Sequence, residues 1–130
     1  MTKYKYDYVD YYKTVLDLED DAAAVNMGGS WRMPTAEEQE ELIDECTWTG
    51  TTLNGVEGYN VKGPNGNSIF LPAGYYIGDD LYYESYGNYW SSSLFTVDSS
   101  NAYSLRFYSG SVDRHFYNRC CGLSVRGVCP

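Results

Sequence analysis

Positive charge is scarce in this chain. Nine Lys and Arg oppose eighteen Asp and Glu over 130 residues, which gives a formal net charge of −9 at pH 7. Proteins that bind nucleic acid displace counterions with clustered Lys and Arg, whereas this chain repels phosphate on average. The charge balance therefore argues against nucleic acid as a partner.

Long apolar runs are also missing. No stretch approaches the roughly 20 apolar residues that a helix needs to cross a membrane, and the N-terminus lacks the apolar core of a signal peptide. We therefore expect no membrane span and no signal peptide in this chain. Export would depend on another chain or on a particle that carries this one.

This chain has few of the residue types that form most catalytic and metal sites. His115 is the single His, and nothing marks an Asp, Ser or Cys partner for a catalytic triad. The four cysteines match no zinc spacing and are too few for a disulfide scaffold: Cys46, Cys120, Cys121 and Cys129. Adjacent strand residues face opposite ways, so Cys120 and Cys121 would not converge on a metal or substrate. We expect no enzymatic activity, no cofactor and no metal.

What the chain has in plenty is Tyr and Gly, fifteen and thirteen residues, with three Trp and four Phe. This composition favours strands, turns and aromatic packing, and the length fits one domain. Tyr4, Tyr6 and Tyr8 alternate, which predicts a strand within residues 1–13. A terminus that merely packs on the domain would have the same pattern.

Two helices are expected in the first third of the chain. Residues 16–27 place Leu18 and Val25 at helical spacing, and acidic residues occupy the first turns, where a helix favours negative charge. We prefer this interpretation of the acidic residues to a calcium site. Thr35 and Glu38 have the spacing of a capping box, which predicts a second helix that ends at Cys46.

Strands are expected after residue 47, where turn dipeptides become frequent. Ser68–Pro72 and Tyr89–Ser93 are the candidate buried strands, and side chains alternate in polarity over Ala102–Tyr108. A turn at Ser109-Gly110 would bring the next strand alongside, and Leu123 and Val125 would mark a last strand. The expected core consists of Trp31, Leu42, Ile69, Leu71, Trp90, Leu105, Phe107 and Val125.

Several of these segments together resemble a known family. They are Gly28–Glu38 with its motif Trp31-Arg32-Met33-Pro34-Thr35, then Ser68–Pro72, Tyr89–Ser93 and the closing Asn118–Arg126. The pattern resembles C-type-lectin-like domains of the Fibrobacter major paralogous type and, more distantly, the formylglycine-generating enzyme superfamily. Gly127 stands where that family usually has Pro. The resemblance implies an α+β fold in which two helices pack on short antiparallel strands in one loop-rich domain, residues 1–130.

The last forty residues also resemble the variable region of proteins diversified by retroelements, in which template adenines are copied as any base. An Asn codon mutated at its first two positions cannot yield Lys, Glu, Gln, Met or Trp, and residues 91–130 contain none of these five. Residues 1–90 would then be the scaffold. A fixed paralogous domain could lack the same five types by composition alone.

The expected binding surface surrounds the C-terminal hairpins and mixes aromatics and Arg with small polar side chains, as antibody loops do. Its candidate residues are Phe95, Val97, Ser104, Arg106, Tyr108, Ser111, Asp113, Arg114, His115, Phe116 and Cys121. The resemblance implies a receptor-recognition protein that binds a protein or glycan and is displayed on a phage particle or bacterial cell surface. The alternatives are a fixed bacterial surface adhesion or glycan-binding module and, third, a formylglycine-generating type of enzyme.

Overall fold

The structure, a computed structural model, describes residues 13–77, 80–82, 86–108 and 110–129. Its two helices are α1 (Ala22–Met27) and α2 (Ala36–Glu45). Its strands are β1 (Thr47–Leu53), β2 (Val56–Lys62), β3 (Ser68–Pro72), β4 (Tyr75–Ile77), β5 (Asp80–Tyr82), β6 (Gly87–Leu94), β7 (Asn101–Tyr108) and β8 (Ser111–Asn118). The strand predicted near the N-terminus lies outside the described residues.

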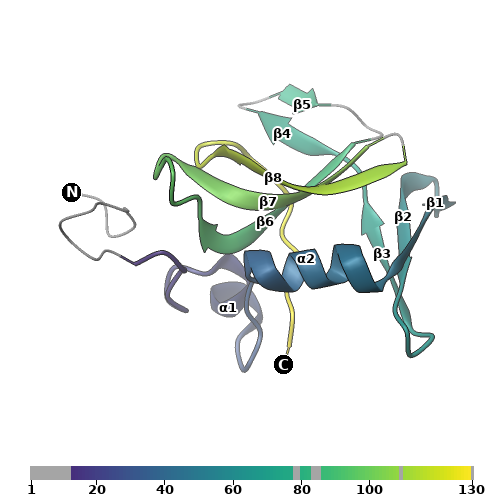
Figure 1. Ribbon diagram of the computed structural model, residues 1–130, viewed down its shortest axis with the longest axis horizontal. Coiled ribbons are helices and arrows are strands. Elements are labelled where there is room, and N and C mark those ends of the chain that lie inside the picture. Colours follow the sequence, from purple (N-terminus) through teal and green to yellow (C-terminus); the bar gives the residue numbers. More distant parts are fainter. Residues whose placement is uncertain (1–12, 78–79, 83–85, 109, 130) are drawn as a thin grey trace.

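The described strands form three antiparallel sheets. Two of them are three-stranded, with the orders β1-β2-β3 and β6-β7-β8, and β4 pairs with β5. In Figure 1, α2 runs below the β6-β7-β8 sheet and the β4-β5 hairpin lies above it. Helix α2 contacts all three strands of the β6-β7-β8 sheet, so one face of that sheet is covered by the helix.

The predicted α+β class, with two helices packed on the strands, is wrong, because the described chain is mostly strand. Helix α1 has six residues and buries only Ala23, while Leu18 and Val25 are 63% exposed. The physical cause is Asp21, whose buried carboxylate accepts hydrogen bonds from the Ala23 and Ala24 amides. This cap starts the helix at Ala22, so the predicted helix from residue 16 is shortened by half.

The prediction for α2 is confirmed. Thr35 Oγ1 accepts a hydrogen bond from the Glu38 amide, and Glu38 Oε1 accepts one from the Thr35 amide, so the capping box is complete. Arg32 adds a bidentate ion pair to Glu38, with N···O distances of 2.6 and 2.9 Å. Cys46 adopts an extended conformation and ends the helix, as expected.

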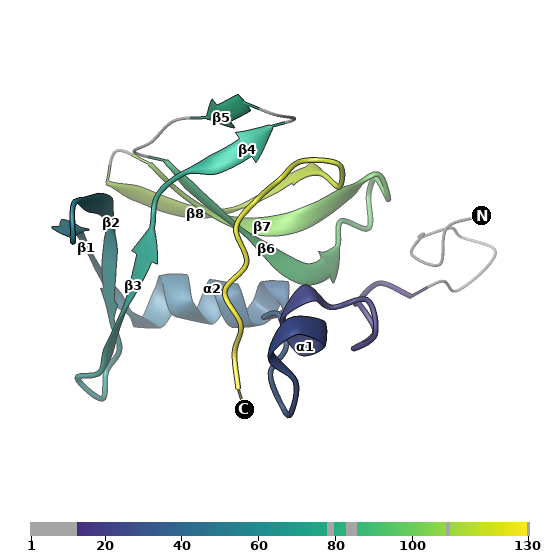
Figure 2. The same ribbon diagram turned by 180° about the vertical axis from the view of Figure 1, so that it is seen from behind.

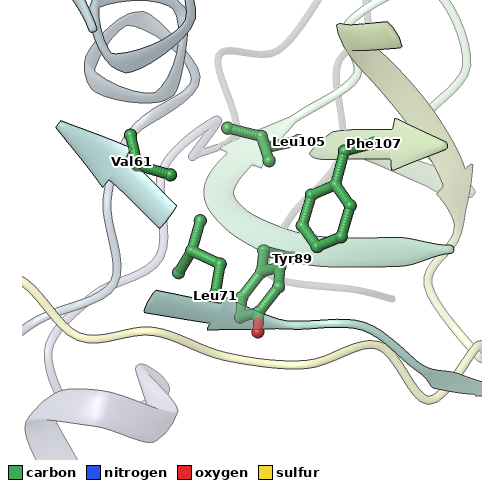
Figure 3. Packing of buried hydrophobic residues seen from close by; sticks show 5 residues of the cluster. All are labelled: Val61, Leu71, Tyr89, Leu105 and Phe107. Carbon is green, nitrogen blue, oxygen red and sulfur yellow. The ribbon is translucent and has the colours of Figure 1, made fainter. Parts of the chain in front are cut away.

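The core lies where the two larger sheets meet. Val61, Leu71, Tyr89, Leu105 and Phe107, from β2, β3, β6 and β7, converge there (Figure 3). The Phe107 ring contacts the rings of Trp48, Tyr59 and Tyr89 at centroid distances of 6.0, 4.9 and 6.2 Å. One aromatic side chain of β7 thus connects both sheets.

The predicted core is partly correct. Leu71, Leu105 and Phe107 are buried as expected, and Leu42 and Ile69 pack against them while partly exposed. Trp31, Trp90 and Val125 lie outside the core: Trp31 is 37% and Val125 41% exposed, and Trp90 is half-buried. The register explains Trp90, because Trp90 pairs with Ser104 while its neighbour Tyr89 pairs with Leu105 on the core face.

The strands predicted at Ser68–Pro72 and Tyr89–Ser93 are confirmed as β3 and as part of β6. The last predicted strand does not form. Ser124 makes only an isolated bridge to Tyr89, and Val128 makes one to Arg32, so the C-terminal segment is an irregular strap across the domain. Among the helices described, none has the length and apolarity to cross a membrane.

Candidate ligand-binding surface

The β7-β8 hairpin holds most of the candidate residues. Its eight pairs run without a shift from Asn101↔Asn118 to Tyr108↔Ser111, which confirms the predicted hairpin. Directly opposed residues share a face of an antiparallel pair. Arg114, opposite Leu105, therefore lies on the α2 face, and Asp113, opposite Arg106, lies on the other face. The candidate residues are divided between these two faces.

An aromatic cluster with one guanidinium lies on the α2 face, beside the helix. Phe95 stacks on Phe116 with ring centroids 4.1 Å apart and meets the Tyr103 ring edge-on at 5.2 Å. The Arg114 guanidinium lies 4.8 Å from the Tyr103 ring centroid. Its Nη1 also pairs with Glu40 Oε2 of α2 at 3.2 Å. We call Phe95, Tyr103, Arg114 and Phe116 the aromatic cluster.

Tyr103 is the member of the aromatic cluster that the sequence did not predict, because the alternation of β7 placed it with the buried residues. It pairs with Phe116 across the strands and is half-buried. Phe116 is 41% exposed. The available signal was the turn at Ser109-Gly110, since counting back from it puts residues 103 and 116 opposite each other.

The opposite face has a charge pair instead of an aromatic stack. Arg106 Nε and Nη2 donate to Asp113 Oδ1 and Oδ2 at 3.0 and 2.8 Å. This hydrogen bonding raises the pKa of Arg106. The Arg106 guanidinium also lies 4.8 Å from the ring centroid of Tyr108, which in turn contacts the ring of Tyr86. The side chains of Arg106, Asp113 and Tyr108 therefore interact mainly with one another and with Tyr86.

His115 connects the two faces along β8. Its ring lies 5.2 Å from that of Phe116 and 5.0 Å from that of Tyr117. Burial and, after it, the charge of Arg106 lower the pKa of His115. The imidazole is therefore neutral at pH 7 and acts as a polar aromatic ring in this surface.

Ser104 is misplaced in the predicted surface, because its side chain is fully buried. It lies on the central strand of the sheet, paired with Trp90 of β6 on one side and His115 of β8 on the other. The remaining candidates lie at the periphery. Val97 and Ser111 are exposed, and Cys121 is half-buried beyond the end of β8.

Two of the four thiols are poor nucleophiles. Burial raises the pKa of Cys46 and of Cys121, so both remain neutral thiols at pH 7, whereas a catalytic cysteine needs a lowered pKa.

Asp17, Glu19 and Asp20 bring ligand atoms within 4.8 Å of one another. Lys13 Nζ already bonds both carboxylate oxygens of Asp17 at 2.7 Å, so this group is partly neutralised by the chain itself. The three residues precede α1, which begins at Ala22, so the prediction that they form the first helical turns is wrong.

Comparisons of the chain with family models, with curated proteins and with solved structures found no match. Function is therefore inferred from this chain's own residues.

Proposed function

We propose that this chain is a non-enzymatic recognition protein that binds a protein or glycan receptor through its C-terminal hairpin. The observation that carries the proposal is the aromatic cluster, in which stacked Phe95 and Phe116 and the ion-paired Arg114 remain accessible at one end of the sheet. Phe, Tyr and Arg are enriched in protein interfaces, and Tyr and Arg are among the residues that contribute most of the binding energy. We further propose display on a phage particle or a bacterial cell surface.

The cluster suits binding because its side chains are held in place before a ligand arrives. Immobilising a flexible side chain on binding costs about 0.5–1.5 kcal/mol. The stacking of Phe95 on Phe116 and the contact of Arg114 with both Tyr103 and Glu40 reduce that cost. The rest of the domain is strongly acidic, with sixteen of the eighteen acidic residues before residue 91, so the hairpin is also where an anionic receptor would meet least repulsion.

We also propose that a retroelement diversifies the C-terminal hairpin on both of its faces, the aromatic cluster being the part that contributes most to binding. The absence of Lys, Glu, Gln, Met and Trp from residues 91–130 supports it. So does the position of the expected variable side chains: Arg106, Tyr108, Asp113, His115, Phe116 and Cys121 are each half-buried or exposed. Substitution there changes the surface with small effects on packing. Ser104 is excluded from the residues expected to vary, because its side chain is buried.

A paired set of variants tests recognition by the aromatic cluster. The protein is screened against bacterial cells and a glycan array, and affinity for the captured receptor is measured. Arg114→Ala with Phe116→Ala should lower that affinity by about a thousandfold, since anchor residues contribute about 2 kcal/mol or more each, about 4 kcal/mol for the pair. Tyr108→Ala with Ser111→Ala changes the opposite face and should have a much smaller effect. If the two pairs of substitutions lowered the affinity equally, the aromatic cluster would not be the binding site.

The nucleotide sequence of the gene tests the retroelement proposal and requires no purified protein. Codons for Arg106, Tyr108, Asp113, His115, Phe116 and Cys121 should be two variable bases followed by a pyrimidine, and a near-copy of the region should carry adenines there. Codons for the buried Leu105 and Phe107 should match the copy. Purines at the third position of most of these codons would end the retroelement proposal and leave a fixed surface adhesion or glycan-binding module.

A further inference from the structure

A cavity of about 360 Å³ lies away from the aromatic cluster, on the side where the C-terminal strap crosses α2. Figure 2 shows this strap running down past α2 beside β3. The strap is fixed by two backbone hydrogen bonds between Arg32 and Val128, at 3.0 and 2.8 Å. One wall of the cavity is therefore anchored chain, and its volume is within the range of small-molecule sites.

The walls of this cavity are mainly apolar. Leu71, Tyr89 and Leu105 approach one another from β3, β6 and β7 (Figure 3), and all three line it. The apolar lining also includes Trp31, Pro34, Leu42, Ile69 and Val128. The Tyr89 hydroxyl donates to the Pro72 carbonyl at 2.7 Å and is thereby satisfied within the protein. A ligand here would meet an apolar surface with an indole at its edge.

The cavity has one uncommitted charge. Glu38 lines it, but the hydrogen bond from Arg32 lowers the pKa of this carboxyl to about 2, so Glu38 is ionised and already paired. Arg126 also lines it, and the described residues offer its guanidinium no ion pair or hydrogen bond. In contrast, Arg32, Arg106 and Arg114 all pair with carboxylates.

A buried acceptor at the same cavity also lacks a donor. Gln39 lines it and is 3% exposed, and its Nε2 donates to the Tyr89 and Trp90 carbonyls at 3.0 and 3.2 Å. These two bonds fix the orientation of the amide. Its Oε1 accepts no hydrogen bond from the described residues. Leaving a buried acceptor unsatisfied costs about 1–3 kcal/mol, which is unusual unless another molecule supplies the donor.

We propose that this cavity binds a small carboxylic acid with an apolar, aromatic-sized body. The carboxylate pairs with Arg126, and the body lies against Trp31, Leu42 and Leu71. In a chain with a net charge of −9, an anion requires a local unpaired cation, and Arg126 provides it. This site is separate from the receptor-binding surface proposed above, since no member of the aromatic cluster lines it.

A second cavity, of about 260 Å³, does not share these features. Its charged lining residues are Asp20 and Arg119, and both already have partners; Arg119 Nη1 donates to the Ser99 carbonyl at 3.0 Å. It therefore offers no uncommitted charge to a ligand.

Calorimetric titration with indole-3-acetate tests the proposal, because this probe combines a carboxylate, an aromatic body and one N–H donor. The full chain should bind one equivalent saturably. The methyl ester of the probe, which has the same body without the charge, should bind about tenfold more weakly, as loss of a charged hydrogen bond predicts. Absence of saturable binding, or equal affinity for acid and ester, would overturn the proposal.

Two variants test whether Arg126 is the residue that pairs with the carboxylate of the probe. Arg126→Gln should lower the affinity for indole-3-acetate by about tenfold. It should leave the melting temperature unchanged, because the described part of the chain offers this side chain no partner to lose. Lys62→Gln, a matched loss of one exposed positive charge on β2, should bind like the parent. Equal effects of the two variants would show nonspecific charge attraction and refute the site. The Arg114→Ala, Phe116→Ala pair should bind the probe normally, so failure of receptor recognition and failure of this site are distinguishable.

Discussion

Gly87 and Phe107 show how one residue position can depend on another across a sheet. They are paired in the β6-β7 register, and Phe107 is fully buried. A Cβ added at Gly87 would lie 2.0–2.5 Å from three carbons of the Phe107 ring. Such distances are impossible without moving the ring, and the ring is held by its contacts with Trp48, Tyr59 and Tyr89. Glycine is therefore required at position 87 by packing.

Gly87→Ala should lower the free energy of unfolding by about 1–3 kcal/mol, the usual cost of overpacking a core. Urea unfolding measures it. Gly50→Ala on β1 is the matched control, since a Cβ there would meet only the Tyr59 ring, at an ordinary 3.8 Å. That variant should stay within about 0.5 kcal/mol of the parent. If both variants were equally stable, the Phe107 ring could not lie against Gly87.

At the scale of elements, the start of α2 depends on Glu38. This side chain closes the capping box with Thr35 and pairs with Arg32. The hydrogen bond from Arg32 is the main reason that the pKa of Glu38 falls from 4.5 to about 2. A carboxyl whose pKa is lowered by folding stabilises the folded state at any pH above its ordinary pKa. That stabilisation is lost as the pH falls from about 4.5 to about 2.

Glu38→Gln should therefore be less stable than the parent at pH 7, by about 1 kcal/mol, because the half-exposed side chain is screened by water. The difference should shrink as the pH is lowered through the range from 4.5 to 2. Urea unfolding of both proteins at several pH values measures it. Glu41→Gln, on the same helix and exposed, removes one carboxylate without removing the capping box or the Arg32 pair, and is the control at pH 7. A difference that is constant with pH would mean that the ion pair does not form.

At the scale of the whole molecule, Phe107 joins the two larger sheets. Its ring contacts β1, β2 and β6 from β7, so the two sheets share one core through it. Phe107→Ala should destabilise the protein by about 3–5 kcal/mol, a large part of a domain's total stability. Phe116→Ala makes the same chemical change in the same hairpin at a 41% exposed position and should cost only about 1 kcal/mol. Equal melting temperatures for the two variants would contradict the shared core.

The sequence predicted those helices and strands that are specified by residues close together in the chain. The capping box of Thr35 and Glu38, the β3 strand and the hairpin of β7 with β8 were all correct, because each is specified within a short segment. The predicted first helix was too long, because Asp21 caps a helix that begins at Ala22. Both oxygens of its carboxylate also accept one bifurcated hydrogen bond from the distant Met33 amide. That second partner is twelve residues away and could not be foreseen from helical spacing.

For the binding surface, sequence by itself determined which residue types were available and which strands carried them. The alternation of β7 and the turn after it were enough to place Asp113 near Arg106, because side chains alternate along a strand and a tight turn fixes the pairing that follows it. The alternation also assigned Leu105 and Phe107 of β7 to the core, as observed, whereas only the tertiary structure decided which face of β6 meets the core and which outer-face side chains are covered. It buried Ser104 on the central strand between Trp90 and His115, grouped Tyr103 with Phe95 and Phe116, and placed Tyr89 rather than Trp90 in the core. Those outcomes depend on register and on the position of α2 over one face of the sheet, and both arise from contacts between segments far apart in the sequence.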